Sequence, residues 1–259
     1  MRGGGTDVPS TVLPPLSVAN REPDGRVISW VVSLLSGTLK PFTRRDWRGQ
    51  EKVPPTGGVV FVVNHISNVD PLAIGQYLAF SGRWPRFLAK ASLFRVPVVG
   101  EVIRACGQIP VERGTATAHD ALTAAVAAVQ AGRAVVVYLE GTITLDPDLW
   151  PMRGRSGAAR IALQTGAPVV PLGQWGAQDI MYGKRIHPPK LLPRKTLRVV
   201  AGDPVPLDDL RAVPTSPAVL AEATERLTDA LTALVAELRG EQPPAGRFDP
   251  RSGRREVGG

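Results

Sequence analysis

Cysteine is nearly absent from this sequence. Only one, Cys106, occurs among the 259 residues, so an intrachain disulfide and a zinc site built from several cysteines are excluded. A lone thiol is compatible with a reducing cytoplasm, and we expect it to be a small buried side chain. The N-terminus also lacks the continuous apolar core and the cleavage pattern of a signal peptide, so we do not expect secretion.

Sequence motifs for nucleotide binding and for a serine nucleophile are missing as well. The chain contains no G-x-x-x-x-G-K-[ST], no G-x-G-x-x-G after a strand-like run and no G-x-S-x-G. His119 and His187 have no metal-ligating residues at suitable spacing. We therefore expect neither a metal nor a cofactor.

Aromatic residues are scarce, and acidic residues are fewer than basic ones. There are 31 Lys and Arg against 23 Asp and Glu, which gives a net charge of +8. Such a chain is attracted to a polyanion, either nucleic acid or an anionic membrane surface. Aromatics make up only 5% of the residues, and no recognised nucleic-acid motif is present. We expect no nucleic-acid partner, and keep a non-catalytic nucleic-acid-binding protein as an alternative.

The composition divides the chain into four segments. Residues 1–25 and 240–259 are rich in small, proline or charged residues without periodicity, and we expect both to be disordered tails, the second of them basic. Between them we expect a membrane-interface helix over residues 26–45 and a single folded domain over residues 46–239.

Residues 26–42 predict a helix that is apolar around most of its circumference. Its polar residues fall at steps of four, three and four and form a narrow stripe, namely Ser29, Ser33, Ser36 and Lys40. The run is shorter than the about 20 apolar residues that span a bilayer, so the helix could lie in the membrane interface without crossing it. A helix packed on the core of the same domain is equally compatible with this pattern.

The central domain alternates apolar runs of strand length with helical patterns. The strand-length runs are residues 58–63, 86–90, 108–112, 134–139, 168–173 and 196–202. Strands that are apolar throughout and alternate with helices indicate an α/β fold with a mainly parallel sheet covered by helices on both faces. Ligands of such folds usually bind beyond the carboxyl ends of the strands.

One of these strand ends carries a histidine and an aspartate. The apolar run GVVFVV leads into NHISNVDP, and Asp70 with Pro71 is a typical helix start. His65 then lies in the loop before the helix, where a turn could bring it to Asp70 and leave one imidazole nitrogen as a base. The alternatives are a plain helix cap and a loop histidine bonded to backbone. A histidine base without a protein nucleophile favours a substrate that brings its own hydroxyl or water.

Two other strands and a short apolar run also end in polar residues. Glu140, Gly141 and Thr142 follow one strand, while Glu112 with Arg113 and Lys90 end two other runs. Glycine lets the backbone approach a ligand, and arginine suits a phosphate through its forked donors. Because the carboxyl ends of parallel strands meet at one edge, we expect these residues to form one pocket with the histidine.

These stretches resemble four ordered motifs of the glycerolipid acyltransferases, in particular the lysophosphatidic acid acyltransferases. NHISNVD is similar to the first motif, with His65 and Asp70 in the catalytic places. GQIPVERG is similar to the second, with Arg113 at the acceptor-binding arginine. YLEGT and APVVPLG are similar to the third and fourth, and the resemblance extends over residues 57–206.

The resemblance implies a glycerol-phosphate acyltransferase-like fold and a reaction. The reaction is direct transfer of a fatty acyl group from acyl-CoA or acyl-carrier protein, as co-substrate, to the free hydroxyl of lysophosphatidic acid. In this mechanism His65, oriented by Asp70, removes the hydroxyl proton as the oxygen attacks the thioester. Backbone amides of the motif loops stabilise the oxyanion.

The third motif departs from the family pattern, which usually reads Pro-Glu-Gly-Thr-Arg. Leu139 precedes Glu140 here, and Ile143 replaces the arginine that helps to bind the acceptor phosphate. We therefore expect phosphate recognition to fall to other cations, namely Lys90, Arg113, Arg153 or Arg155, and expect Glu140, Gly141 and Thr142 to complete the substrate-binding set. Another acceptor, such as a glycolipid or an ornithine-type lysolipid, is the first alternative, and a lipid hydrolase is another.

A water-insoluble acceptor also bears on the N-terminal helix. It favours the interfacial position of residues 26–42, since the positive charge of the chain adds attraction to anionic lipid. We expect a monotopic or peripheral enzyme on the cytoplasmic face of the cell membrane. Its expected partners are a lysophospholipid acceptor, an acyl thioester donor and an anionic membrane surface.

Overall fold

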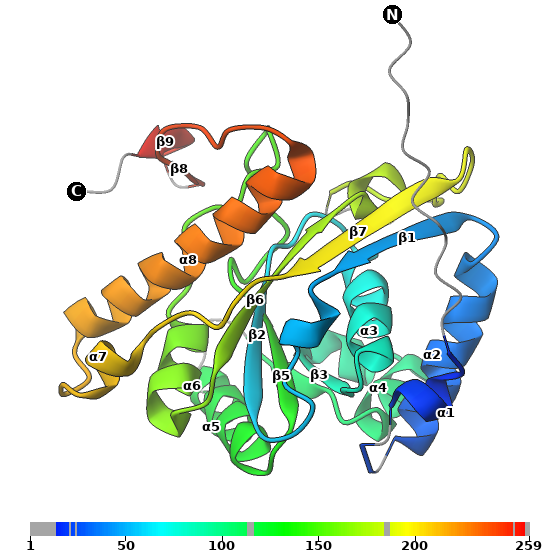
Figure 1. Ribbon diagram of the computed structural model, residues 1–259, viewed down its shortest axis with the longest axis horizontal. Helices are drawn as coiled ribbons and strands as arrows, with labels where there is room; N and C mark the ends of the chain where they lie inside the picture. Colours follow the sequence, from blue (N-terminus) through cyan, green and yellow to red (C-terminus); the bar gives the residue numbers. More distant parts are fainter. Residues whose placement is uncertain are drawn as a thin grey trace, which may run out of the picture.

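A seven-stranded sheet forms the centre of the molecule, with the strand order β1-β7-β6-β2-β5-β3-β4 (Figure 1). The computed structural model describes residues 14–20, 22–23, 25–112, 117–183, 187–250 and 252–256. The strands are β1 (Thr43–Arg48), β2 (Val59–Val63), β3 (Pro85–Lys90), β4 (Ile109–Val111), β5 (Ala134–Tyr138), β6 (Val169–Trp175) and β7 (Lys195–Ala201). Five neighbouring pairs are parallel and β6–β7 is antiparallel, which confirms the predicted mainly parallel sheet.

Helices cover both faces of this sheet (Figure 1). They are α1 (Leu16–Ala19), α2 (Arg26–Leu39), α3 (Asp70–Phe80), α4 (Val99–Ala105), α5 (Thr117–Gln130), α6 (Gly157–Thr165), α7 (Asp208–Arg211) and α8 (Pro217–Arg239), with short 3-10 turns η1 (Gln50–Lys52), η2 (Ala91–Arg95) and η3 (Ala177–Asp179). One core cluster joins the sheet to α5, α6 and α8, and a second joins it to α3.

Strand β2 shows why its sequence is apolar without alternation. All five of its side chains are buried. Val60 and Val62 belong to the core cluster of α5, α6 and α8, while Val59, Phe61 and Val63 belong to the cluster of α3. Successive side chains of a strand point to opposite faces, so a strand covered on both faces must be apolar at every position.

The N-terminal boundaries differ from the predicted ones. Helix α2 ends at Leu39, and residues 43–45, predicted as helix, begin the polar edge strand β1. An edge strand has one neighbour and partial burial, so it carries no apolar signature. Within the predicted N-terminal tail, residues 16–19 form α1, because Leu16 is buried in a cluster with α2 and α3.

The C-terminal tail also differs from the disorder predicted for it. Residues Arg247–Asp249 and Arg254–Glu256 pair as the antiparallel strands β8 and β9. Their arginines form ion pairs with acidic residues of α8 and of the loop after β5. Composition alone predicts disorder here because the acidic partners lie far away in the sequence.

Candidate active site

The candidate site lies where two central strands end. Strands β2 and β5 are parallel neighbours, and Val63 pairs with Tyr138 at their carboxyl ends. The loop that carries His65 therefore lies next to the loop that carries Glu140. Polar residues 75 positions apart in the sequence meet there, since the His65 amide donates to Glu140 Oε1 at 3.2 Å.

The predicted contact between His65 and Asp70 is present. The distance from His65 Nδ1 to Asp70 Oδ2 is 2.8 Å. Asp70 is the first residue of α3, and its carboxylate turns back to the preceding loop, where Oδ2 also accepts the amides of Ile66 at 2.7 Å and Ser67 at 2.9 Å. The turn before the helix thus makes a spacing of five residues compatible with a direct hydrogen bond.

These contacts define which histidine nitrogen can act as a base. Asp70 Oδ2 accepts two amide hydrogens, so this oxygen carries no hydrogen of its own to donate. In its contact with His65 Nδ1 it is therefore the acceptor as well. Nδ1 therefore carries the hydrogen, and Nε2 keeps its lone pair. Burial raises the pKa of Asp70, while its hydrogen bonds with His65 and the two amides oppose that rise.

An aromatic ring fixes the plane of the imidazole. Tyr138, at the end of β5, stacks on His65 with ring centroids 4.0 Å apart and an interplanar angle of 18°. Phe87 of β3 lies parallel to Tyr138 on the cavity side at a centroid distance of 6.1 Å. Tyr138 was not among the predicted site residues. A ring at a strand end beside a candidate base is the signal that could have identified it.

Glu140 braces two loops. Its side chain is 3% exposed, Oε1 accepts the His65 amide, and Oε2 accepts the Met152 amide at 3.1 Å. Burial raises the pKa of Glu140 to about 8, against the lowering effect of these amides. The predicted substrate contact is not what the structure gives this residue, because both carboxylate oxygens face backbone amides of the protein.

A second brace connects the histidine loop to β6. The backbone amide of Gln174 donates to Asn64 Oδ1 at 2.9 Å, and Gln174 Nε2 donates to the backbone carbonyl of Asn64 at 3.0 Å. In return, Asn64 Nδ2 donates to the backbone carbonyl of Gln174 at 3.1 Å. Neither residue was predicted as part of the site. In the sequence, each is an amide residue at or just after the end of an apolar run, and this position is the signal that could have identified them.

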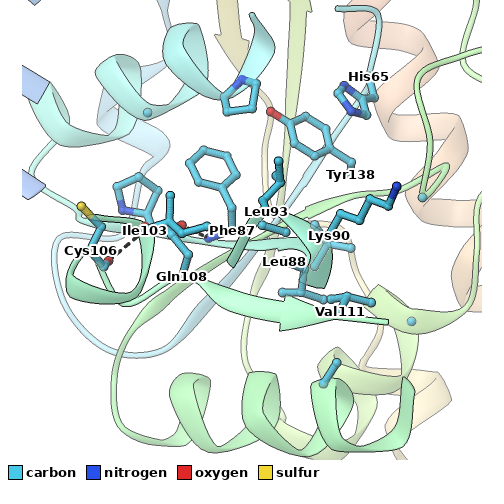
Figure 2. Close-up of a pocket in the computed structure, with 18 of the residues that line it drawn as sticks. His65, Phe87, Leu88, Lys90, Leu93, Ile103, Cys106, Gln108, Val111 and Tyr138 are labelled. Atoms are coloured by element: carbon cyan, nitrogen blue, oxygen red, sulfur yellow. Dashed lines mark hydrogen bonds between the residues drawn. The ribbon is translucent and has the colours of Figure 1, made fainter. Parts of the chain in front are cut away.

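A large cavity extends from His65. Its volume is about 1040 Å³, and its lining includes residues of α2, α3, α4, β3, β5 and α6. Figure 2 shows His65 at one side of this cavity and Cys106 at the opposite side, with apolar side chains between them, among them Phe87, Leu88, Leu93, Ile103 and Val111. The base therefore opens onto a long apolar space.

The predicted substrate-binding residues have different positions. Lys90, Gly141, Thr142 and Arg155 line the cavity. Lys90 and Arg155 are exposed, which puts them at its open side. Arg153 does not line it: its side chain is 72% exposed and lies 3.9 Å from Glu225 of α8, so the predicted role in phosphate recognition is not supported.

Arg113, the predicted acceptor-binding arginine, lies outside the described residues.

Gly141 has a φ of 68°, and a Cβ there would lie 2.7 Å from Cδ of Arg155. The close approach of backbone expected at this glycine is thus made to Arg155, whose Nε donates to the Glu140 carbonyl at 3.2 Å. Arg155 therefore packs against, and is hydrogen-bonded to, the loop of Glu140 and Gly141 at the cavity.

Comparison with solved structures identifies a related fold. The crystal structure of the 1-acyl-sn-glycerophosphate (LPA) acyltransferase PlsC from Thermotoga maritima matches with a TM-score of 0.63 and 22% sequence identity. The match covers 88% of this chain and 87% of that one. At this level of identity the likeness is one of fold.

Sequence comparison gives relatives with a named activity. The chloroplastic 1-acyl-sn-glycerol-3-phosphate acyltransferase BAT2 of Brassica napus is 32% identical over 149 residues, and the chloroplastic LPAT1 of Arabidopsis thaliana is 28% identical over 146 residues. The chain matches 41% of the length of the first and 39% of the second. The family model named Acyltransferase matches residues 44–175, about half of the chain. These residues contain the histidine loop, the aspartate and the Glu140 loop, and the chain belongs to the Acyltransferase family.

Proposed function

We propose that this protein transfers a fatty acyl group from an acyl thioester to the free hydroxyl of a lysophospholipid, with lysophosphatidic acid as the acceptor and phosphatidic acid as the product. One observation carries the proposal: the His65–Asp70 pair lies at the end of an apolar cavity of about 1040 Å³. A cavity of this size and lining suits a fatty acyl chain. The printed activity of the two plant relatives supports the choice of acceptor.

The geometry of His65 and Asp70 supports a direct transfer. His65 Nε2 takes the proton of the acceptor hydroxyl as its oxygen forms a bond to the thioester carbonyl carbon. The carbon–sulfur bond then breaks, and the imidazolium returns the proton to the thiolate. Asp70, held by His65 and two amides, stabilises the imidazolium while it exists.

Recognition of the acceptor headgroup depends on the cations at the open side of the cavity. Lys90 and Arg155 both line it, and an arginine fork binds a phosphate bidentately. Ile143 is buried and lines the cavity where the family pattern has an arginine. This substitution favours the second candidate function, acyl transfer to a lysolipid without a phosphate monoester, such as a glycolipid or an ornithine-type lipid.

An assay with paired donors and acceptors tests the proposal. Purified protein receives acyl-CoA or acyl-carrier protein, together with lysophosphatidic acid, a lysoglycolipid, an ornithine-type lysolipid or no acceptor. We expect phosphatidic acid from lysophosphatidic acid. If only another lysolipid is acylated, that lysolipid replaces lysophosphatidic acid as the proposed acceptor. Release of free fatty acid at a rate independent of any acceptor would identify a hydrolase.

The length of the acyl chain should depend on Gly75. This residue of α3 lines the cavity, and a Cβ there would have its nearest neighbour, Cε2 of Phe87, at an unstrained 3.9 Å. Gly75→Leu therefore places a branched side chain in the cavity without distorting the helix. We expect kcat/KM for a long-chain donor to fall about tenfold or more relative to a medium-chain donor. Gly75→Ala is the control, and equal losses for both donors would contradict the assignment.

We also propose that the protein binds the cytoplasmic face of the cell membrane as a monotopic or peripheral enzyme. Two faces of helix α2 support this proposal: Ile28 and Val32 are buried in a cluster with α1 and α3, whereas Trp30 is 64% and Leu34 51% exposed. A neighbouring segment from η2 to α4 exposes Leu93, Val96, Val98 and Val99. None of the described helices is long and apolar enough to cross a membrane.

Acidic substitutions on the exposed face of α2 test this position. Trp30→Glu with Leu34→Glu should lower binding to anionic phospholipid vesicles about tenfold or more, because apolar area is lost and negative charge is gained. Both side chains point away from the buried face, so the fold should persist. Val213→Glu is the matched control: Val213 is also exposed and lies near α7, on the far side of the sheet from α2 (Figure 1). Equal vesicle binding by the double variant and the control would refute the position.

A further inference from the structure

We propose that Arg255 of the C-terminal hairpin is a positioning residue for His65, acting through the loop between β5 and α6. The part of this loop that matters is residues 140–152, called the brace loop below. The proposal rests on acyl transfer as the function of the site. It assigns a role to a segment that lies beyond residue 175, where the match to the family model ends.

The first step is the contact between Arg255 and Asp146. Asp146 is fully buried in the brace loop. Arg255 lies with Nη1 at 2.6 Å from Asp146 Oδ2 and with Nη2 at 2.8 Å from Oδ1, and Nη2 also contacts Asp148 at 2.9 Å. A buried carboxylate is strongly unfavourable without a cation, and Arg255 supplies one through the hydrogen bond from Nη2 to Oδ1 and the ionic contact between Nη1 and Oδ2.

The second step leads from Asp146 to the backbone of His65. The Asp146 amide donates to Thr144 Oγ1 at 3.2 Å, and that hydroxyl donates to the Trp150 carbonyl at 3.0 Å. The Thr144 amide in turn donates to the His65 carbonyl at 2.7 Å. Together with Glu140, which accepts the His65 amide, the brace loop bonds both backbone polar groups of His65.

The brace loop needs outside support to keep this conformation. Leu149 within it has a φ of 64°, an unfavourable backbone region for a leucine. Support comes from Arg239 at the end of α8. Its Nη1 donates to the Asp148 carbonyl at 2.6 Å, and its Cζ lies 4.0 Å from the centroid of the Trp150 ring. Arg247 attaches the hairpin itself to Glu225 and Asp229 of α8. The hairpin thus joins α8 to the brace loop.

Four variants test whether Arg255 positions the base. They are Arg255→Ala, Arg255→Lys, Arg255→Ala with Asp146→Asn, and the control Arg254→Ala, an exposed neighbour on the same strand. We measure kcat and KM for the acyl donor, the melting temperature, and amide hydrogen exchange of residues 64–70 and 140–152. The double variant removes the buried charge together with its cation, so it separates positioning from stability.

Arg255→Ala should lower kcat about tenfold or more and change the donor KM less than twofold, because a small displacement of a base is costly. Lysine should restore part of kcat, and the double variant should restore the melting temperature without restoring kcat. Arg254→Ala should resemble wild type. A kcat within twofold of wild type for Arg255→Ala, or recovery of kcat with melting temperature in the double variant, would overturn the proposal.

Hydrogen exchange keeps the proposal separable from the proposed function, since it needs no turnover. Arg255→Ala should increase exchange in both segments, and Arg254→Ala should not. If wild-type protein fails to transfer acyl groups, increased exchange at residues 64–70 still supports the contact path. Unchanged exchange there overturns it.

Discussion

Replacing His65 with alanine should lower the kcat of acyl transfer about a thousandfold or more, since general-base catalysis contributes about 10²- to 10⁴-fold. His65 is the group whose free nitrogen, Nε2, can accept the acceptor's proton, because Nδ1 is held by Asp70 at 2.8 Å. Donor KM should change little, since the apolar cavity remains. Product formation from labelled acyl-CoA and lysophosphatidic acid provides the measurement.

The control for this prediction is His119→Ala. His119 is exposed on α5 and does not line the cavity, so its replacement should leave both kcat and the melting temperature unchanged. The side chain of His65 is 16% exposed at the cavity wall and contacts the buried Asp70, so the melting temperature of His65→Ala is measured alongside its kcat to confirm that the variant is folded. Acyl transfer that persists in folded His65→Ala protein would refute the mechanism whichever lipid is the acceptor.

Replacing Asp70 should reduce both activity and stability, and two variants separate these effects. Asp70→Ala leaves the amides of Ile66 and Ser67 and the His65 ring without their acceptor. Buried donors without partners cost about 1–3 kcal/mol each, so the free energy of unfolding should fall by about 3 kcal/mol or more, with a lower melting temperature. The kcat should fall at least a hundredfold.

Asp70→Asn keeps an oxygen that can accept the two amides but removes the charge that stabilises the imidazolium. We therefore expect a smaller loss of stability than in the alanine variant, with kcat still about a hundredfold lower. Unfolding by denaturant and steady-state kinetics measure the two effects. Wild-type kcat in Asp70→Asn would show that the carboxylate charge does not assist the base.

Local sequence was sufficient to predict the candidate base and its partner. The apolar residues of β2 indicate a strand buried on both faces, and Asp70 with Pro71 indicates a helix start. The chain between them is short, so a turn is all that is needed to bring His65 to Asp70. The mainly parallel sheet was predictable for a similar reason, because each strand and helix carries its own periodicity.

The predictions that failed concern residues whose partners lie far away in the chain. Arg153 was one of the cations expected to bind the acceptor phosphate in place of the missing arginine at position 143, but its side chain lies against Glu225 of α8. The C-terminal arginines were assigned to disorder because their composition is that of a tail. In both cases the side chain's position depends on which acidic residue the fold brings near it.

The sequence by itself determined strands β2 to β7, the alternation of these strands with helices, the family and the His65–Asp70 pair, because these depend on periodicity and on contacts across a few residues. Only the tertiary structure decided how that pair is held. The Asn64–Gln174 brace joins residues 110 positions apart, and the Arg255–Asp146 contact joins residues 109 positions apart. Such contacts leave no periodic signal, because they form only after the strands have taken their order in the sheet and the helices have packed on it.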